Sequence, residues 1–313
     1  MKSGAQSEVK KLRRLLLHRP RPDDFRWVRQ DTQAYYNIDA TIEPEKFLID
    51  YDKMVDAFAA QGVEIVFLTD VLKNHAEALR YISRRPNLTY MRDMATVYNE
   101  GAVVMNPYLK GRQWDGWVVT ECFRKLGIPI LGEITYPGYL EGGGNGFLNN
   151  EIGYVSLCDR ANEDAIDQLA SYALPKSLEQ LIVVNLPAGH IHIDGLFMVV
   201  GEKAVFVHRP VLEISPTRVM HRGGRIEHVW FLDYLSELGY EIIDGPCTAD
   251  IMGSAMNYNY VAFAPWRVIG YDYVTTNAKV IKARDGEVIA IPGLELSKGR
   301  GGVHCMTCPV LRE

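Results

Sequence analysis

Five widely separated residues carry the groups that nucleophilic chemistry on a cation needs. Cys305 supplies a thiol and His192 an imidazole, while Asp93, Glu141 and Asp194 supply carboxylates. A cysteine thiolate is a strong nucleophile, and a histidine beside it can carry protons to and from the reacting groups. Carboxylates bind a cation most strongly when it is a guanidinium, which can donate several hydrogen bonds at once. The set therefore predicts a substrate with a guanidinium group, because a cysteine protease would not need these carboxylates.

Each of these residues has a plainer interpretation when it is taken alone. An isolated cysteine in an apolar neighbourhood is more often buried and inert than catalytic. The glycines that follow Glu141, Gly142-Gly143-Gly144, commonly form just a turn, and no Gly-Lys-Ser/Thr follows to make a phosphate-binding loop. The catalytic interpretation depends on the residues occurring together, at matching places of a repeated unit.

The cysteines argue against a disulfide framework and against a metal site. The chain has five, at positions 122, 158, 247, 305 and 308, an odd and widely spaced set. Only Cys305 and Cys308 form a Cys-x-x-Cys pair, and no second pair completes a zinc site. We interpret Cys308 as a packing residue, with redox regulation of Cys305 as the alternative. Since thiol, imidazole and carboxylate suffice for the chemistry, the sequence predicts neither a metal nor an organic cofactor.

Composition and charge indicate an ordinary globular protein. The 313 residues include 34 Lys plus Arg and 39 Asp plus Glu, for a net charge of −5, and 47% are hydrophobic. A mildly acidic chain without a basic tail argues against nucleic acid as a partner. No apolar run approaches the ~20 residues that span a bilayer. Only Leu15 to Leu17 follow the basic N-terminal stretch, too short for a secretory signal. We expect a cytoplasmic protein with no membrane partner.

One helix–strand unit recurs along the chain. Asp50 to Gln61 has helical spacing of apolar residues, stops at Gly62 and is followed by the apolar run Val63 to Leu68. Glycine is a good helix terminator because it tolerates positive φ. The same pattern recurs around Gly127 (Thr120 to Leu131) and around Gly239 (Val229 to Ile243), 65 and 112 residues further on. The second gap is about two units long, and Leu178 to Leu186 fits the slot between them.

Hairpin-like segments lie between these units. Runs rich in Val, Ile, Phe and Tyr flank Asn or Gly turns in Ala95–Met105, Gly146–Leu157, Leu196–His208 and Ala278–Ile291, which is the expected hairpin signal. Units of about sixty residues that mix strands with one helix favour a ring of about five. An unrelated set of α/β elements is the alternative. Since no linker-like segment interrupts the chain, we expect residues 1–313 to form a single domain.

Polar clusters precede three of these hairpins. Arg92-Asp93 lies before the first, Glu141 with its glycines before the second, and His190 to Asp194 before the third. A fourth cluster, Gly299 to Cys305, lies near the C-terminus. If the units form a ring, equivalent positions converge near its axis, and the thiol, the imidazole and the carboxylates meet in one pocket.

At this point the sequence resembles a known family. The stretch Gly299-Arg-Gly-Gly-Val-His-Cys305-Met-Thr-Cys-Pro309 is similar to the nucleophile motif of bacterial arginine deiminases, which are guanidino-group-modifying enzymes. Further motifs occur in family order and cover nearly the whole chain: Leu17-His-Arg-Pro20, Pro86-Asn-Leu-Thr-Tyr-Met-Arg-Asp93, Leu140-Glu-Gly-Gly143 and His192-Ile-Asp-Gly-Leu-Phe197. The resemblance implies a five-bladed α/β propeller (pentein) built from ββαβ-type units, consistent with the repeat.

The resemblance also implies roles for the catalytic residues. Cys305 would attack the guanidinium carbon and form a thiouronium intermediate, which hydrolysis converts to a ureido product. His192 would protonate the departing amine and then activate water. Asp93 and Asp194 would clamp the guanidinium nitrogens, and Glu141 would hold the guanidinium or orient His192. The carboxylates favour a protonated His192, so the bound cation itself would help to ionise the thiol.

Substrate recognition follows from the same resemblance, with two departures. Asn87, Tyr90, Arg112, Arg160 and Arg300 lie where the family places residues that bind substrate, the arginines and the asparagine at its carboxylate; each arginine could instead be a solvated surface residue. The aspartate that closes the family's Glu-Gly-Gly-Asp motif is absent, because Gly144 and Asn145 stand there. The family's helical insert is also missing, since only 14 residues separate Leu72 from Pro86. Both departures leave modified guanidines open as substrates.

Three functions follow from these expectations. The first is hydrolysis of arginine or a related small guanidino compound, with loss of one nitrogen, of two nitrogens to give ornithine, or of a methylated amine. The second is an amidinotransferase, although such enzymes usually lack the Glu-Gly-Gly segment retained at Glu141. The third is a non-catalytic binder, which retention of all five reactive residues opposes. Association with further copies of the chain is left open.

Overall fold

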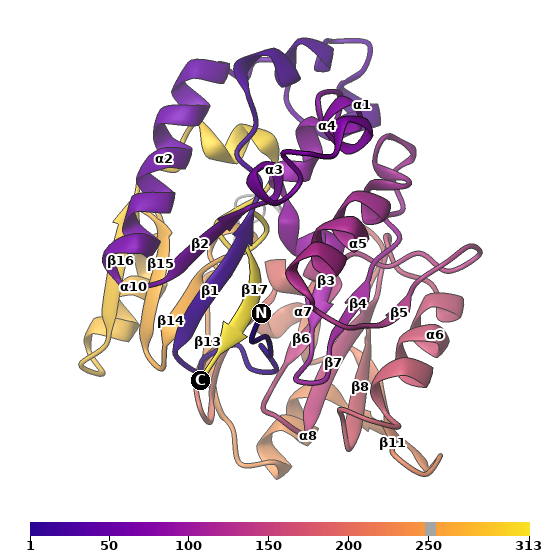
Figure 1. Ribbon diagram of the computed structural model, residues 1–313. Helices are drawn as coiled ribbons and strands as arrows, with labels where there is room; N and C mark the ends of the chain where they lie inside the picture. Colours follow the sequence, from indigo (N-terminus) through magenta and orange to yellow (C-terminus); the bar gives the residue numbers. More distant parts are fainter. Residues whose placement is uncertain (248–254) are drawn as a thin grey trace.

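Five small sheets are arranged around a common centre in the computed structural model, which describes residues 1–247 and 255–313 (Figure 1). Every sheet is built on the same pattern. Two strands form an antiparallel hairpin or pair, a helix follows, and a third strand runs parallel to the second. This ββαβ unit is the predicted repeat, and the fold is the predicted five-bladed α/β propeller.

Four blades are continuous in sequence. Their strands and helices are β3 (Ala95–Val97), β4 (Ala102–Val104), α5 (Asp115–Leu126) and β5 (Ile130–Glu133); β6 (Asn145–Phe147), β7 (Ile152–Leu157), α6 (Glu163–Ala173) and β8 (Gln180–Asn185); β9 (Phe197–Gly201), β10 (Ala204–Val207), α8 (Phe231–Glu237) and β13 (Glu241–Asp244); and β14 (Val261–Ala264), β15 (Arg267–Tyr271), α10 (Thr276–Lys282) and β16 (Glu287–Ile291).

The fifth blade joins the two ends of the described chain. Strand β1 (Leu12–Leu17) lies between β17 (Cys308–Arg312), its antiparallel partner, and β2 (Glu64–Phe67), its parallel partner. Leu12 pairs with Arg312 and Leu16 with Cys308. Helix α2 (Pro44–Ala60) supplies the crossover between β1 and β2. The ring is therefore closed by hydrogen bonds between the first strand and the last, and Figure 1 shows β1 and β17 side by side.

The sequence of α2 explains why it forms and where it stops. Pro44 occupies the first turn, where its missing N–H costs nothing. Phe47, Tyr51, Met54 and Phe58 recur at helical spacing, and each is fully buried. The turn after the helix contains Gly62 at φ 73°, a left-handed conformation that glycine adopts without penalty. Gly127 ends α5 in the same way, at φ 69°.

Three sequence expectations about the elements need correction. The predicted hairpin over Ala278–Ile291 is wrong: this segment contains α10 and then β16, and Asp285 at φ 56° makes the turn between them. The hairpin of this blade is β14–β15, whose turn contains Trp266 at φ 60°. The helix expected to begin at Val229 begins at Phe231, and Leu178 to Leu186 holds only strand β8, whose helix α6 lies upstream.

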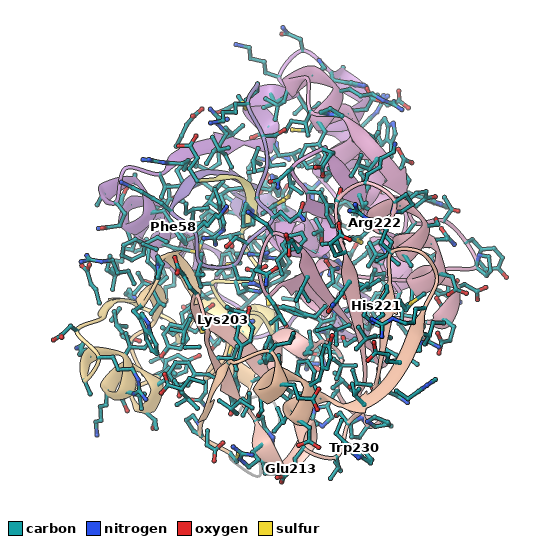
Figure 2. All side chains as sticks on the ribbon, turned by 90° about the horizontal axis from the view of Figure 1, so that it is seen from below. Phe58, Lys203, Glu213, His221, Arg222 and Trp230 are labelled. Atoms are coloured by element: carbon teal, nitrogen blue, oxygen red, sulfur yellow. The ribbon has the colours of Figure 1, made fainter. Side chains whose placement is uncertain are left out.

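The remaining elements are short, apart from one hairpin that widens a blade. Strands β11 (Pro216–His221) and β12 (Ile226–Trp230) extend the β6–β7–β8 sheet to five strands. Figure 2 shows side chains filling the interior, with Trp230 of β12 at the periphery. The other elements are η1 (Pro22–Trp27), α1 (Gln33–Tyr36), α3 (Leu68–Val71), α4 (Ala76–Ile82), η2 (Pro86–Thr89), η3 (Met91–Met94), η4 (Lys110–Arg112), η5 (Gly142–Gly144), η6 (Ile193–Gly195), α7 (Arg209–Leu212) and η7 (Leu296–Gly299). Among the described helices, none is long and apolar enough to cross a membrane.

Candidate active site

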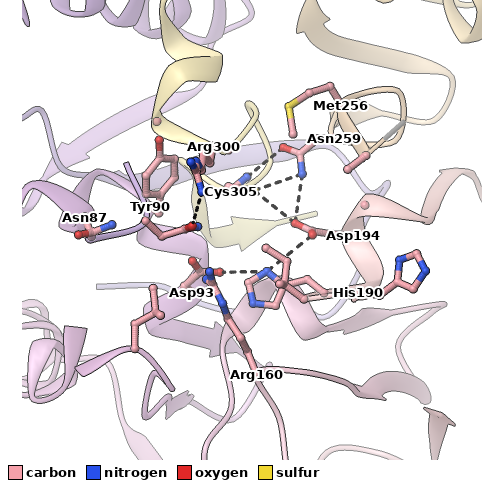
Figure 3. A pocket seen from close by; sticks show the side chains of 18 of the residues that line it. Asn87, Tyr90, Asp93, Arg160, His190, Asp194, Met256, Asn259, Arg300 and Cys305 are labelled. Carbon is pink, nitrogen blue, oxygen red and sulfur yellow. Dashed lines mark hydrogen bonds and ion pairs between the residues drawn. The ribbon is translucent and has the colours of Figure 1, made fainter. Parts of the chain in front are cut away.

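Each blade places polar side chains at the same structural position, immediately before its first strand. Asp93 lies on η3 before β3, Glu141 precedes η5 before β6, and Asp194 lies on η6 before β9. The matching positions before β14 and β17 hold Asn259 and Cys305. Because the first strands surround the axis, these side chains converge on one cavity (Figure 3). The structure thus brings together all five residues expected to be catalytic, and adds Asn259.

The Cys305 thiol keeps part of its surface open to this cavity. Its Sγ lies 3.5 Å from Oδ2 of Asp194 and 3.2 Å from Nδ2 of Asn259. Removal from water raises the pKa of Cys305 well above its ordinary value, and the charges of Asp194 and Asp93 raise it further. The free protein therefore holds Cys305 as a neutral thiol.

His192 is held from one side of its ring. Its Nε2 lies 2.8 Å from Oε2 of Glu141, and since a carboxylate only accepts, Nε2 carries the proton. Its Nδ1 faces Asp93 Oδ1 at 4.0 Å and Asp194 Oδ1 at 3.9 Å. Burial lowers the pKa of His192, but Asp93, Glu141 and Asp194 outweigh burial and raise the pKa above its ordinary value. The imidazole is thus biased toward its charged form.

Two buried arginines compensate the carboxylates. Arg160 Nη1 donates to Glu141 Oε2 at 3.0 Å, and Arg112 Nη1 donates to Asp93 Oδ2 at 2.6 Å. Burial raises the pKa of Glu141, but Arg160 and His192 overcome burial and hold that pKa far below its ordinary value. Both arginines come from loops of other segments, so the pairs form only in the folded chain. Arg112, which the sequence left as evenly balanced between pocket and surface, is only 2% exposed.

Asp194 connects the nucleophile to a second buried layer. Its Oδ2 accepts from Nδ1 of His304 at 2.9 Å, in addition to the contacts with Asn259 and Cys305. His304 Nε2 in turn faces Glu8 Oε2 at 3.6 Å. Burial raises the pKa of Glu8, but Arg92, 3.7 Å away, and His304 hold it at about 2. The layer keeps Asp194 charged, with a pKa below its ordinary value.

Glycine is required where the site is most crowded. A Cβ on Gly142 would lie 1.9 Å from the Arg92 carbonyl oxygen, and one on Gly143 would lie 2.6 Å from Nδ1 of His192. The Gly143 N–H also donates to Asp93 Oδ1 at 3.2 Å. On the opposite side, a Cβ on Gly301 would lie 2.4 Å from the Tyr90 ring. The glycines of these two motifs therefore leave room for the site rather than simply making turns.

The remaining residues expected to bind substrate also line the cavity. Asn87 is buried; its Nδ2 donates to the Tyr36 carbonyl and its Oδ1 has no hydrogen-bond partner. Tyr90 is buried, and its hydroxyl likewise has no partner. Arg300 is exposed at the mouth, at φ 63°, and donates to Asn37 Oδ1 at 3.1 Å. The cavity encloses about 800 Å³, counting its open mouth.

The donor atoms of Asp93, Glu141 and His192 lie within 4.8 Å of one another, which is close enough to hold a metal ion. The chemistry of the set opposes this use. Arg112 and Arg160 already donate to the two carboxylates, and a protonated His192 cannot coordinate. Positive charge in this cluster therefore comes from guanidinium and imidazolium groups, and the residues do not fit a metal.

Asn259 is the site residue that sequence reasoning missed. The missed β14–β15 hairpin explains the omission, because the polar clusters were sought just ahead of hairpins. Asn259 lies two residues ahead of Val261, the first residue of β14. The same rule that selected Asp93 and Asp194 would have selected Asn259.

A five-bladed α/β propeller with a cysteine, a histidine and carboxylates at its axis defines the class of the guanidino-group-modifying proteins. The chain belongs to the arginine deiminase family, whose model matches residues 76–312. An arginine deiminase from Listeria monocytogenes is 26% identical over 267 residues, which cover 74% of this chain and 63% of that protein. The match thus spans less than two thirds of the relative's length.

Solved structures share the fold at low sequence identity. A DDAH from Pseudomonas aeruginosa, complexed with citrulline, superimposes with a TM-score of 0.69 at 14% identity, covering 96% of this chain and 100% of that chain. The amidinotransferase SxtG from Microseira wollei superimposes with a TM-score of 0.70 at 11% identity, covering 100% and 98%. The fold therefore serves different chemical outcomes, and the site must decide between them.

Proposed function

We propose that the protein hydrolyses the guanidinium group of arginine or a related guanidino compound, releasing ammonia and a ureido product through a covalent adduct on Cys305. The observation that supports this most directly is the convergence of a thiol, a carboxylate-bound imidazole and the two carboxylates Asp93 and Asp194 on one cavity. The arginine deiminase family relationship agrees with it.

The carboxylates would orient the substrate. Asp93 Oδ1 and Asp194 Oδ1 both face Nδ1 of His192 and are not the oxygens that hold Arg112 and His304. A guanidinium donating to these two oxygens would have its carbon near the Cys305 sulfur. Paired carboxylates provide this geometry because the guanidinium donates in a plane.

The proton inventory fits a reaction that begins when the cation binds. The free site holds Cys305 as a thiol because Asp93 and Asp194 raise its pKa. A guanidinium between those carboxylates neutralises them, so that the thiolate forms next to a cation. His192, charged in the free site, then protonates the departing amine and afterwards accepts a proton from the attacking water.

The arginines and Asn87 would bind the other end of the substrate. Arg112 and Arg160 line the cavity beside the carboxylates, and Arg300 lies at its mouth. Asn87 offers an unpaired amide oxygen, and Tyr90 forms part of the wall. A substrate with a carboxylate on its distal end fits these cations best, as an α-amino acid such as arginine does.

Mass spectrometry of the purified protein with L-arginine tests the proposal, with Cys305→Ala as control. Citrulline formed only by the unmodified chain supports a deiminase, and ornithine indicates removal of both nitrogens. A product that forms only when an amine is added would identify an amidinotransferase instead. No turnover of arginine or of methylated and other substituted guanidines, with or without an amine, would overturn the proposal.

We also infer a single domain over residues 1–313 and a cytoplasmic location. The closure of the ring by β1 and β17 supports the first inference, because the two ends complete one blade. The composition and the free cysteines support the second, since cysteines persist unpaired in reducing compartments.

A further inference from the structure

Asn259 lies at the bottom of the cavity with a side chain fixed at both ends. Only 4% of the residue is exposed. It occupies the position before the first strand of its blade, where other blades present Asp93, Asp194 and Cys305. Figure 3 shows its amide between Cys305 and Asp194.

The orientation of the amide is set by the backbone. Its Oδ1 accepts from the backbone N–H of His304 at 3.0 Å and of Cys305 at 3.3 Å. An amide flipped by 180° would bring its NH₂ group against these two donors, so the observed orientation is the one that satisfies the hydrogen bonds. Gly302 permits the close approach, because a Cβ there would lie 2.2 Å from Asn259 Oδ1.

The NH₂ group is therefore forced to point at the nucleophile. Nδ2 lies 3.2 Å from Cys305 Sγ and 3.2 Å from Asp194 Oδ2. Among the side chains described around Sγ, Asn259 is the one that donates a hydrogen bond to it, since Asp194 can only accept. A fixed donor aimed at an atom that becomes negative stabilises the charge without reorganisation.

We propose that Asn259 is a catalytic residue that donates a hydrogen bond to the Cys305 sulfur whenever that sulfur carries the negative charge. The inference rests on the proposed function and assigns the residue a role in the same site. Sulfur is an anion twice in that reaction. It attacks the guanidinium carbon, forming the S–C bond as the C–N bond breaks and ammonia leaves with a proton from His192. Water then adds to the carbon and gives a proton to His192, and the S–C bond breaks with its electrons returning to sulfur.

Alkylation of Cys305 by iodoacetamide, followed by peptide mass spectrometry across a pH series, measures the proposed interaction without substrate. Exposed Cys247 in the same molecule reports the reactivity of the reagent. Asn259→Ala removes the donor without adding charge, and we expect the pH midpoint of Cys305 alkylation to rise by about one unit. Asn259→Asp retains an acceptor for the two backbone N–H groups and should raise the midpoint further. We also expect kcat to fall by roughly 10²-fold in both variants, the usual cost of losing one such donor.

Asn277→Ala is the matched control. Asn277 is equally buried and donates to the Asn257 carbonyl at 2.6 Å, so its loss perturbs the same loop and leaves the donor to sulfur in place. An alkylation midpoint that stays unchanged in Asn259→Ala and Asn259→Asp would overturn the proposal. So would an equal shift in Asn277→Ala, which would show an effect of the loop alone. A shifted midpoint in a chain that turns over no guanidine would support the hydrogen bond and contradict only the proposed reaction.

Discussion

Nε2 of His192 and Oε2 of Glu141 lie 2.8 Å apart inside the protein, where Glu141 is fully buried and His192 is 7% exposed. The contact fixes a proton on Nε2 and turns Nδ1 toward the cavity. Nδ1 is therefore the atom that exchanges protons with the substrate in the proposed reaction. Glu141 acts through this contact and, with Asp93, raises the pKa of His192.

Glu141→Gln should shift the pH dependence of activity. The reaction needs the charged imidazole, and its pKa is raised partly by Glu141, so activity is lost as pH rises through that pKa. Removing the charge of Glu141 lowers the pKa of His192, and the alkaline fall in kcat/KM should begin at lower pH, with kcat reduced by roughly 10²-fold. Glu121→Gln, which removes a surface carboxylate paired with Arg124, is the control. An unshifted alkaline limb would exclude this role for Glu141.

A bound guanidinium should ionise Cys305. The pKa of the thiol is raised in the free site by burial, Asp194 and Asp93, and a cation between those carboxylates lowers it. Titration of thiolate absorbance in the ultraviolet, taken as the difference between the protein and Cys305→Ala, should move to lower pH at a saturating concentration of an unreactive guanidinium ligand. The same titration with a neutral urea analogue should not move. Equal curves with and without the cation would contradict substrate-assisted ionisation.

Gly143→Ala should abolish activity while Gly144→Ala retains it. A Cβ on Gly143 meets His192 Nδ1 at 2.6 Å and Asp194 Oδ2 at 3.1 Å, so the working groups must shift. A displacement of this size costs roughly 10²-fold in rate. A Cβ on Gly144 meets nothing closer than 3.5 Å, and its rate should stay near that of the unmodified chain. Similar steady-state rates for the two variants would contradict the geometry.

Asp115→Asn should change how stability depends on pH. Burial raises the pKa of Asp115 to about 7, against the opposing charges of Arg112 and Arg85. Between pH ~4 and ~7 the unfolded chain releases this proton while the folded chain retains it, so the free energy of unfolding falls as pH rises. The variant lacks this loss, and its advantage should grow by up to about 1.4 kcal/mol per pH unit in that window. Urea unfolding at several pH values measures it; parallel stability curves would disagree.

Much of the architecture could be predicted because local signals agreed with the fold. Gly62, Gly127 and Gly239 each adopt positive φ beyond a helix, as their spacing indicates. Three of the four predicted hairpins exist, each with an Asn or Gly turn. The fifth blade differs, because Trp266 makes the hairpin turn at positive φ and Asp285-Gly286 makes a helix-to-strand turn instead. A bulky residue at such a turn carries no turn signal, and an Asp-Gly pair signals more than one kind of turn.

The site itself could be predicted in composition but not in its pairing. The motifs identified Cys305, His192 and the carboxylates, and the ring explained why they meet. The pairs Arg112–Asp93 and Arg160–Glu141 form between segments of different blades, and nothing local in the sequence encodes them. Glu8, which lies before the first strand, was also not expected near His304. Such contacts follow from the closure of the ring rather than from residue spacing.

That closure has a mechanical consequence. Leu12 and Arg312 form one end of the β1–β17 ladder, and Cys305 lies just beyond the other end, ahead of Cys308. Tension that draws Leu12 and Arg312 apart loads the ladder one hydrogen bond at a time, as in opening a zip, rather than loading all of them in shear. The strand released by this peeling is the one attached to the nucleophile loop. A pull on the two ends of the chain would thus disarm the thiol while the other four blades still hold their shape.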